Sequence, residues 1–401
     1  MTPESNSLPT QDLPTQTGFL LLGAAMAAFV FWHLNPGVEA GTAFAGWHQA
    51  RLYFIGLVMG LVLYHATFGF AGSWRAFILR KNSAGLEAQI VMLGVASLLF
   101  APTLASGEIW GTRIGGAVAP VGLQVAAGAF LFGIGMQLGG GCGSGTLFTV
   151  GGGQSRMILT LITFCTGSFL ASLHMQWWAG LPRLPGISLG IEIGWTAAVF
   201  FQLVMLAGLY WLIRRSGGPP ASFAVRQGLF GKIVRGPWSL LFAAVALALL
   251  NWATLVQSGH PWNITWAFTL WGAKAATLVG WSAEGSWFWT GGFTERALAS
   301  PVLADETSVM NIGIIIGAFI AATLAGRFAP VFKISIRHLM ASVLGGLLMG
   351  YGARIGFGCN IGALFSGIAS TSLHGWLWAV VAFTGAWAGV KLRPAFGLSN
   401  E

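Results

Sequence analysis

The chain alternates long apolar runs with short polar segments that hold most of its charged residues. A run of about 20 apolar residues is long enough to cross a bilayer as an α-helix. The runs predict transmembrane helices near residues 18–34, 88–102, 118–138, 156–173, 191–213, 238–256, 309–326, 335–351 and 374–391. Two shorter, interrupted stretches at 47–74 and 262–290 are better suited to re-entrant segments. The pattern therefore predicts an all-α polytopic membrane protein with about nine spanning helices.

A glycine-rich motif occurs twice, once in each half of the chain. The first copy is GIGMQLGGGCGSGTLFTVGGG, from Gly133 to Gly153, and the second is GYGARIGFGCNIGALFSG, from Gly350 to Gly367. When Cys142 is aligned with Cys359, eight positions are identical: Gly133/Gly350, Gly135/Gly352, Gly139/Gly356, Gly141/Gly358, Cys142/Cys359, Gly145/Gly362, Leu147/Leu364 and Phe148/Phe365. The chain has only three cysteines, so this register indicates an internal repeat with a thiol at its centre.

Glycine at this density does not suit an ordinary helix interior, where each one costs about 1 kcal/mol relative to alanine. It permits positive φ angles and a close approach of backbones instead. Irregular backbone at membrane depth is tolerated only where it is buried in protein or lines a water-filled cavity. Two such interruptions, in corresponding halves, indicate the substrate site of a transporter.

The basic residues orient the predicted helices. The segment 214–235 contains five Lys or Arg residues and no acid, so we expect it in the cytoplasm. Counting spans from it places the N-terminus outside and the C-terminus inside, provided that both interrupted stretches enter and leave on one side. The two glycine motifs then follow helices of opposite direction, which predicts two inverted-topology repeats.

The predicted organisation has four parts: a disordered N-terminal tail at 1–17, a first transmembrane repeat at 18–213, a cytoplasmic basic linker at 214–235 and a second transmembrane repeat at 236–401. The similarity of LLLGAAMAA from Leu20 to LLFAAVALA from Leu240 extends the repeat to the first span of each half.

Composition supports the membrane class. The chain is 55% hydrophobic and 8% charged, whereas soluble domains carry about 25% charged residues. The formal charge of +9 would suit nucleic acid in a soluble protein, but here the basic residues lie between apolar runs and orient the helices. Residues 1–17 contain no Lys or Arg, so they lack the basic start of a cleaved signal peptide. We expect a multi-pass protein of the cell (inner) membrane that binds no nucleic acid.

Five residues stand out chemically. Cys142 and Cys359 are expected to contact substrate, because a thiol is a soft, polarisable group that suits a partner presenting sulfur. Cys165 lies within a predicted span and is expected to pack as a small hydrophobe. Arg354, at the repeat position of a glutamine, and Lys274 are cations in apolar surroundings, which predicts an anionic substrate.

The backbones of Gly141, Gly143 and Gly358 and the side chain of Asn360 complete the predicted substrate-binding set. The sequence contains no phosphate-binding loop, no dinucleotide fingerprint and no zinc-ligand spacing, so neither a cofactor nor a metal is expected.

The motifs GGGCGSGTLFTVGGG and GYGARIGFGCNIGALFSGIASTSLHGWLW, with AFTLWGAK between them, resemble the YeeE/YedE family of sulfur-compound membrane transporters over residues 18–396. The resemblance implies an hourglass-shaped protein in which short re-entrant helices and loops meet at the centre. It also implies uptake of thiosulfate along a central pore through weak contacts with Cys142 and Cys359, and suggests a small TusA-like sulfur carrier as a cytoplasmic partner. Many members have a further cysteine in the first re-entrant segment, in a pattern like FCFxxAFR, where this chain has TFGFAGSWR with Gly69.

Several functions remain open at this stage. Uptake of thiosulfate leads, and a selenium compound or another sulfur oxyanion is an alternative substrate. A membrane sulfurtransferase would instead hold a persulfide on one cysteine, which requires an activated thiolate. A purely structural subunit is disfavoured, because that role does not require repeated thiols at membrane depth. We expect a transporter rather than an enzyme.

Overall fold

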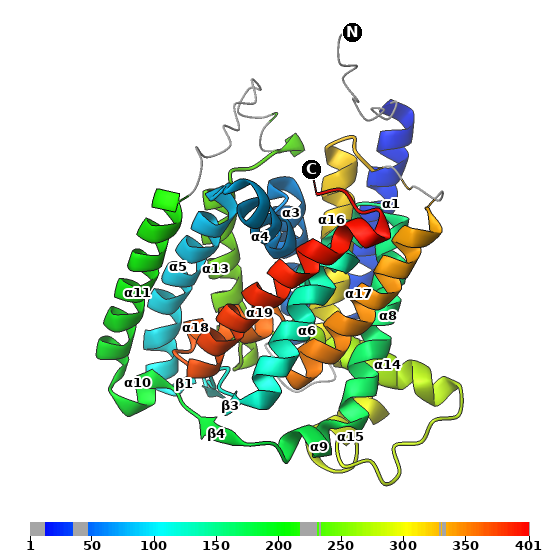
Figure 1. Ribbon diagram of the computed structural model, residues 1–401. Helices are drawn as coiled ribbons and strands as arrows, with labels where there is room; N and C mark the ends of the chain where they lie inside the picture. The colour runs from blue at the N-terminus through cyan, green and yellow to red at the C-terminus, as the bar shows by residue number, and fades with distance from the viewer. Residues whose placement is uncertain are drawn as a thin grey trace.

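The computed structural model describes residues 13–34, 47–216, 231, 234–328, 330 and 334–400, and it is built almost entirely of α-helices (Figure 1). In these residues, ten segments are long and apolar enough to cross a membrane. The principal helices are α1 (Leu13–His33), α3 (His48–Ala66), α5 (Ala84–Ser106), α6 (Leu123–Gly139), α8 (Ser155–Leu173), α11 (Trp195–Ser216), α13 (Leu240–Ser258), α16 (Glu306–Leu324), α17 (Ile336–Ile355) and α19 (Leu373–Leu392). The predicted all-α polytopic class is confirmed, with ten candidate spans in place of about nine.

Shorter elements connect these helices. They are α4 (Phe70–Arg80), α7 (Gly143–Gly151), α9 (Met175–Ala179), α10 (Leu189–Glu192), α14 (Ile264–Leu278), α15 (Gly292–Ala299), η1 (Val302–Ala304), the π-helical η2 (Asn360–Phe365), α18 (Ser366–Ala369) and η3 (Arg393–Phe396). Two small antiparallel sheets pair β1 (Glu108–Ile109) with β2 (Thr112–Arg113) and β3 (Pro120–Gly122) with β4 (Arg183–Gly186). All four strands lie at one end of the molecule (Figure 1).

Helix α3 crosses the whole bundle, so the prediction of a re-entrant segment at 47–74 was wrong. At its start, His48 Nε2 lies 2.7 Å from Glu306 Oε1 at the start of α16. Near its end, the carbonyl of His65 accepts a hydrogen bond of 2.9 Å from the backbone N–H of Trp238, just before α13. The left-handed turn at Thr67 that interrupts the apolar run comes only after this crossing.

The helix packing repeats with exchanged partners. Helix α3 packs along α16, and α13 packs along α5. Helix α6 packs along α19, and α17 packs along α8. Helices α6 and α17 also contact each other. This pattern pairs α3 with α13, α5 with α16, α6 with α17 and α8 with α19. Paired helices run in opposite directions through the bundle (Figure 1), which is the arrangement of an inverted repeat.

The outermost helices extend this correspondence, because α1 packs on α16 as α11 packs on α5. The second half therefore begins with α11 at Trp195, not at residue 236 as predicted, and α3 rather than α1 corresponds to α13. The expected match between the segments at Leu20 and Leu240 failed because outer helices need only an apolar surface. On α1, for example, Phe29 is 67% exposed and Trp32 is 79% exposed.

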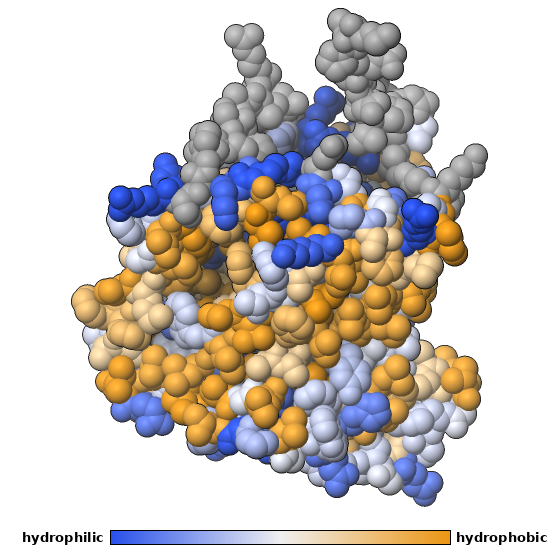
Figure 2. Space-filling model, in the orientation of Figure 1, coloured by the Kyte–Doolittle hydropathy of each residue, from blue (hydrophilic) through white to orange (hydrophobic). Residues whose placement is uncertain are grey.

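One end of the molecule, which we call the basic face, is where α11 ends and α13 begins. Figure 2 shows hydrophilic side chains gathered there above a broad hydrophobic belt. Helix α1 starts at this face, since Gln16 Nε2 donates to the carbonyl of Thr323 near the end of α16 over 2.9 Å. Helix α19 ends at the same face, where Gly397 O lies 3.1 Å from His338 Nε2.

The prediction that the two termini lie on opposite sides therefore fails for the described chain, because α3 adds a span. Residues 13–17, predicted as part of a disordered tail, belong to α1. Residues 1–12 and most of the predicted linker lie outside the described residues.

Glycines allow the helices to pack closely. A β-carbon on Gly56 of α3 would collide with the backbone of Met310 on α16, and one on Gly133 of α6 would lie 2.7 Å from the backbone nitrogen of Ala386 on α19. These contacts explain why so much of the chain's glycine lies inside its spans.

Candidate functional site

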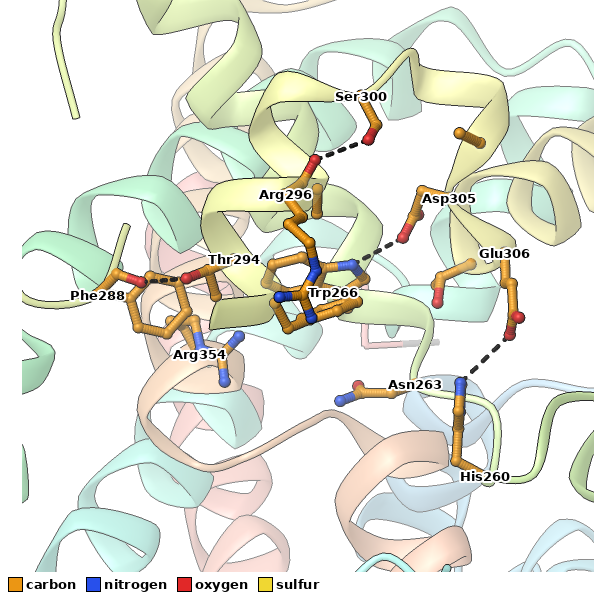
Figure 3. Close-up of a pocket in the computed structure, with 14 residues that line it drawn as sticks. His260, Asn263, Trp266, Phe288, Thr294, Arg296, Ser300, Asp305, Glu306 and Arg354 are labelled. Carbon is orange, nitrogen blue, oxygen red and sulfur yellow. Dashed lines mark hydrogen bonds and ion pairs between the residues drawn. The ribbon is translucent and has the colours of Figure 1, made fainter. Parts of the chain in front are cut away.

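Two cavities enter the bundle from opposite ends and are separated by the glycine motifs. The cavity at the basic face has a volume of about 590 Å³ and is lined by the turn after α3, the start of α4 and the Gly140–Thr149 segment, including Cys142. The cavity at the opposite face has a volume of about 790 Å³ and is lined by residues around α14, α15 and the start of α16, together with Arg354 (Figure 3). The molecule thus has one vestibule on each side of a closed centre.

Each repeat-related cysteine stands at the N-cap position of a short helix. Cys142 precedes α7 in extended conformation, and Cys359 precedes η2 in the same way. The Cys142 Sγ lies 3.4 Å from the Ser144 Oγ, and the Cys359 Sγ accepts the N–H of Ile361 over 3.4 Å. Both side chains are fully buried. The predicted repeat thus has the same local geometry in both halves.

The two thiol segments meet at the centre. A β-carbon on Gly143, the residue after Cys142, would lie 3.1 Å from Cys359 Sγ. On the far side, a β-carbon on Gly362 would lie 2.6 Å from Asn263 Oδ1, and Asn263 lines the cavity of the opposite face. From one vestibule to the other, the order is therefore Asn263, the Cys359 segment, Gly143 and Cys142.

Helix N-termini also converge there. Helix α14 begins next to the thiols, because the side chains of Ile264 and Thr265 approach the β-carbon position of Gly143 at 3.2 and 3.7 Å. Helix α4 begins at Phe70 beside the basic-face vestibule, and α7 begins directly after Cys142. The partial positive charge of a helix N-terminus favours an anion, so the centre is electrostatically suited to negative charge.

Arg354 occupies the opposite vestibule. Its guanidinium points into the cavity from the last turn of α17 (Figure 3), and the guanidinium carbon lies 5.0 Å from the centre of the Phe288 ring. The buried Nε atom has no hydrogen-bond partner among the described residues. Its repeat counterpart, Gln137, is fully buried and donates instead to the carbonyl of Ala71 over 3.0 Å. At this repeat position, one half thus places an arginine in a vestibule and the other a buried glutamine.

The remaining predicted residues differ in their placement. Asn360 is fully buried beside Cys359, and neither amide atom has a partner in the described structure. Gly358 donates its N–H to Ala353 O over 2.8 Å, so that N–H is already used. A β-carbon on Gly141 would lie 3.0 Å from the carbonyl carbon of Gly145. These two glycines therefore serve close packing of the turns.

Lys274 does not join the site. Its Nζ donates to the carbonyls of Leu298 over 2.7 Å and Ser300 over 2.5 Å, at the end of α15. This lysine therefore stabilises a loop at the opposite face, and it is absent from the residues that line the vestibule. An isolated cation in an apolar sequence could not reveal that backbone carbonyls from a distant segment surround it.

Sequence reasoning missed several residues of the site. Arg156 holds the end of α6 by donating to Gly139 O over 3.1 Å, and Arg393 donates to Gln137 O over 2.6 Å. Both fix the backbone that leads into Cys142. Asn263 carries no sequence signal beyond its position at the start of the predicted re-entrant stretch. Gly69 lines the basic-face vestibule, and a β-carbon there would have no atom within 4 Å.

The rim of the opposite vestibule is held by an ionic contact. Glu306 bonds His48 at 2.7 Å and lies 3.2 Å from His260 Nε2. The hydrogen bond to Glu306 raises the pKa of His260. These contacts connect α3, α16 and the turn after α13 at the rim.

Interrupted helices that meet at the centre of a bundle, with a cavity on each face, are the architecture of a membrane transport protein. A family model described as sulphur transport matches residues 65–388. The chain therefore belongs to this family, which confirms the predicted relationship to YeeE/YedE proteins.

Named relatives fall into two groups. The chain is 26% identical to the thiosulfate transporter TsuA of Spirochaeta thermophila over 349 residues, which is 83% of this chain and 95% of the relative. It is 24% identical to the thiosulfate transporter TsuA of Escherichia coli over 362 residues, which is 84% of this chain and 94% of the relative. It is 33% identical to the probable transporter YedE of Escherichia coli over 161 residues, and this match spans 39% of YedE's length.

Proposed function

We propose that this protein takes up a small sulfur-containing anion, with thiosulfate as the first candidate, and that Cys142 and Cys359 contact it in turn. The observation that carries the proposal is the position of the Cys359 Sγ against Gly143, next to Cys142, between the two vestibules. The similarity to two proteins named thiosulfate transporters, over nearly their whole lengths, supports the same substrate class.

The chemistry of the centre suits such a substrate. A thiol is a weak donor and a soft acceptor, so it can exchange one weak contact for the next without binding tightly. An oxyanion that leaves water loses hydration free energy. Arg354 in the opposite vestibule, the amide of Asn360 and the N-termini of α4, α7 and α14 offset part of that loss.

We assign the basic face to the cytoplasm, because cytoplasmic loops carry an excess of Lys and Arg. Uptake then begins in the vestibule that contains Arg354 and ends in the vestibule that contains Cys142. In this orientation the start of α1 and the C-terminus are both cytoplasmic, and the membrane is the cell (inner) membrane. A soluble sulfur carrier of the TusA-like kind would receive the anion at the basic-face vestibule.

The alternative of a persulfide-carrying sulfurtransferase has less support. In the described structure the polar contacts of the two thiols are the Ser144 hydroxyl and the N–H of Ile361. Neither is a base that could deprotonate a thiol to a reactive thiolate. The geometry therefore favours transport.

The test is uptake of labelled thiosulfate into liposomes that contain the purified protein, with protein-free liposomes as the control. We expect saturable uptake that sulfite and sulfate inhibit only weakly, because sulfate has no outer sulfur for the thiols. Equal inhibition by sulfate would show that the thiols do not select the substrate. No uptake of thiosulfate, with transport of a selenium oxyanion instead, would reassign the substrate.

A further inference from the structure

A third cavity lies on the membrane-facing side of the bundle, away from both vestibules. It is a groove of about 370 Å³ between α4, α5, α11, α18 and α19, and its lining is almost wholly apolar. This volume is within the roughly 300–1,000 Å³ typical of ligand sites. Among its lining residues, Val380 is 65% exposed. The groove therefore opens toward the lipid.

The groove follows α5 from the basic face toward the centre of the bundle. Leu86 lies in the first turn of α5, and Leu93 lines the groove two turns later, about 10 Å along the helix axis. One leaflet's hydrocarbon is about 15 Å thick, so the groove extends over most of the leaflet at the basic face. Its inner end is closed by Leu364 and Ile368, in the segment that follows Cys359.

The corresponding space in the other half is closed. There α14 packs directly along α8, where a β-carbon on Gly272 would collide with the carbonyl of Cys165. In the first half, α4 packs less extensively along α19, and the Trp74 and Phe383 ring centres are 5.4 Å apart. The groove is thus a feature of one half rather than a consequence of the repeat.

A cation stands at its mouth on the basic face. The Lys81 Nζ lies 5.3 Å from the centre of the Phe77 ring, and no described residue forms an ion pair with it. The nearby acid Glu87 is already paired with Arg214 at 2.9 Å. An apolar groove of leaflet depth below a free cation matches a lipid with a negative headgroup.

We propose that the groove binds an acyl chain of an anionic phospholipid from the leaflet at the basic face, with its phosphate at Lys81. The chain end would pack against Leu364 and Ile368, behind the segment that carries Cys359. The lipid would therefore support the second thiol segment from outside the substrate path.

The test uses the full chain, purified in detergent, incubated with equal amounts of phosphatidylglycerol and phosphatidylethanolamine, and analysed by native mass spectrometry. We expect one retained phosphatidylglycerol, preferred by about fivefold, since one lysine near a membrane surface contributes about that factor. The variant Ala379→Phe, which fills the groove from α19, should lose this lipid. Leu98→Phe, on an exposed position of α5, should retain it.

Equal retention by the wild type and Ala379→Phe would overturn the proposal. A dimer that Ala379→Phe converts to a monomer would also overturn it, because a second copy would then occupy the groove. If Ala379→Phe does not fold, Lys81→Asn decides, since asparagine tolerates the positive φ of 54° at this position. This variant should bind both lipids equally, and an unchanged preference would contradict the headgroup contact.

Discussion

The sulfur of Cys359 lies 3.1 Å from the point that a β-carbon on Gly143 would occupy. One repeat thus touches the other at the residue that follows its own cysteine. A side chain at Gly143 would press on this sulfur, which would have to shift by a few tenths of an ångström.

We therefore predict that Gly143→Ala abolishes most of the uptake without unfolding the protein. The added methyl group displaces the Cys359 thiol or closes the passage between the vestibules. Labelled uptake at matched membrane abundance measures the effect. Gly94→Ala is the control, because the nearest atom to its β-carbon would be a Leu203 methyl at 3.7 Å. Normal uptake by Gly143→Ala would place the route elsewhere.

Cys142→Ala and Cys359→Ala should each reduce uptake sharply, because each removes a soft contact that the substrate uses. Cys165→Ala, on α8 and outside both vestibules, should transport like the wild type. Thermal unfolding of all three variants should stay close to the wild type. Transport by the double mutant Cys142→Ala/Cys359→Ala would reduce both thiols to packing residues.

Arg354→Gln copies the residue of the other repeat, Gln137, so the variant should fold and insert. We expect it to raise the substrate concentration needed for half-maximal uptake, because the vestibule loses the cation of α17. Arg354→Lys should be intermediate, since lysine keeps the charge without the planar fork. Concentration-dependent uptake distinguishes the three proteins, and an unchanged Gln variant would make Arg354 a structural residue.

Gly69→Cys should be tolerated, because its backbone is extended and no atom lies within 4 Å of the added β-carbon. The new thiol would face the basic-face vestibule, where many family members have a cysteine. A membrane-impermeant thiol reagent should label it from the cytoplasmic side, in a background that lacks the other three cysteines. Labelling only from the outside would reverse the assigned orientation.

Reporter fusions test the topology independently. A reporter placed before Leu13 and one placed after Asn400 should both report the cytoplasm, because α1 begins and α19 ends at the basic face. A periplasmic signal from the first fusion and a cytoplasmic signal from the second would place the two ends on opposite sides of the membrane. That result would contradict the conclusion that α3 spans the membrane.

The sequence predicted the centre of the fold better than its periphery. Cys142 and Cys359 are aligned by identical neighbours because both copies of the turn need glycine at the same positions to bring backbones together. Helices α1 and α11 face lipid, where many apolar sequences serve equally well, so their correspondence left no readable pattern.

Polar residues were harder to interpret, because their roles depend on distant segments. Lys274 was expected in the substrate path, but its partners at Leu298 and Ser300 are carbonyls that sequence does not distinguish. Asn263 lies at the centre because α14 starts there, and its side chain has no conspicuous neighbours in sequence.

The correspondence of α1 with α11 gives each half five of the ten candidate spans. Because five is odd, each half begins and ends on opposite sides of the membrane. A second copy joined to the end of the first therefore starts on the other side and is inverted without any added helix. Gene duplication and fusion alone would then create the arrangement. After such a fusion, the basic residues must settle in different loops of the two copies. In the first half, basic residues lie around Arg80, between the second and third spans, and around Arg156, between the fourth and fifth. In the second half, they lie after the first, third and fifth spans, around Arg214, Arg327 and Arg393.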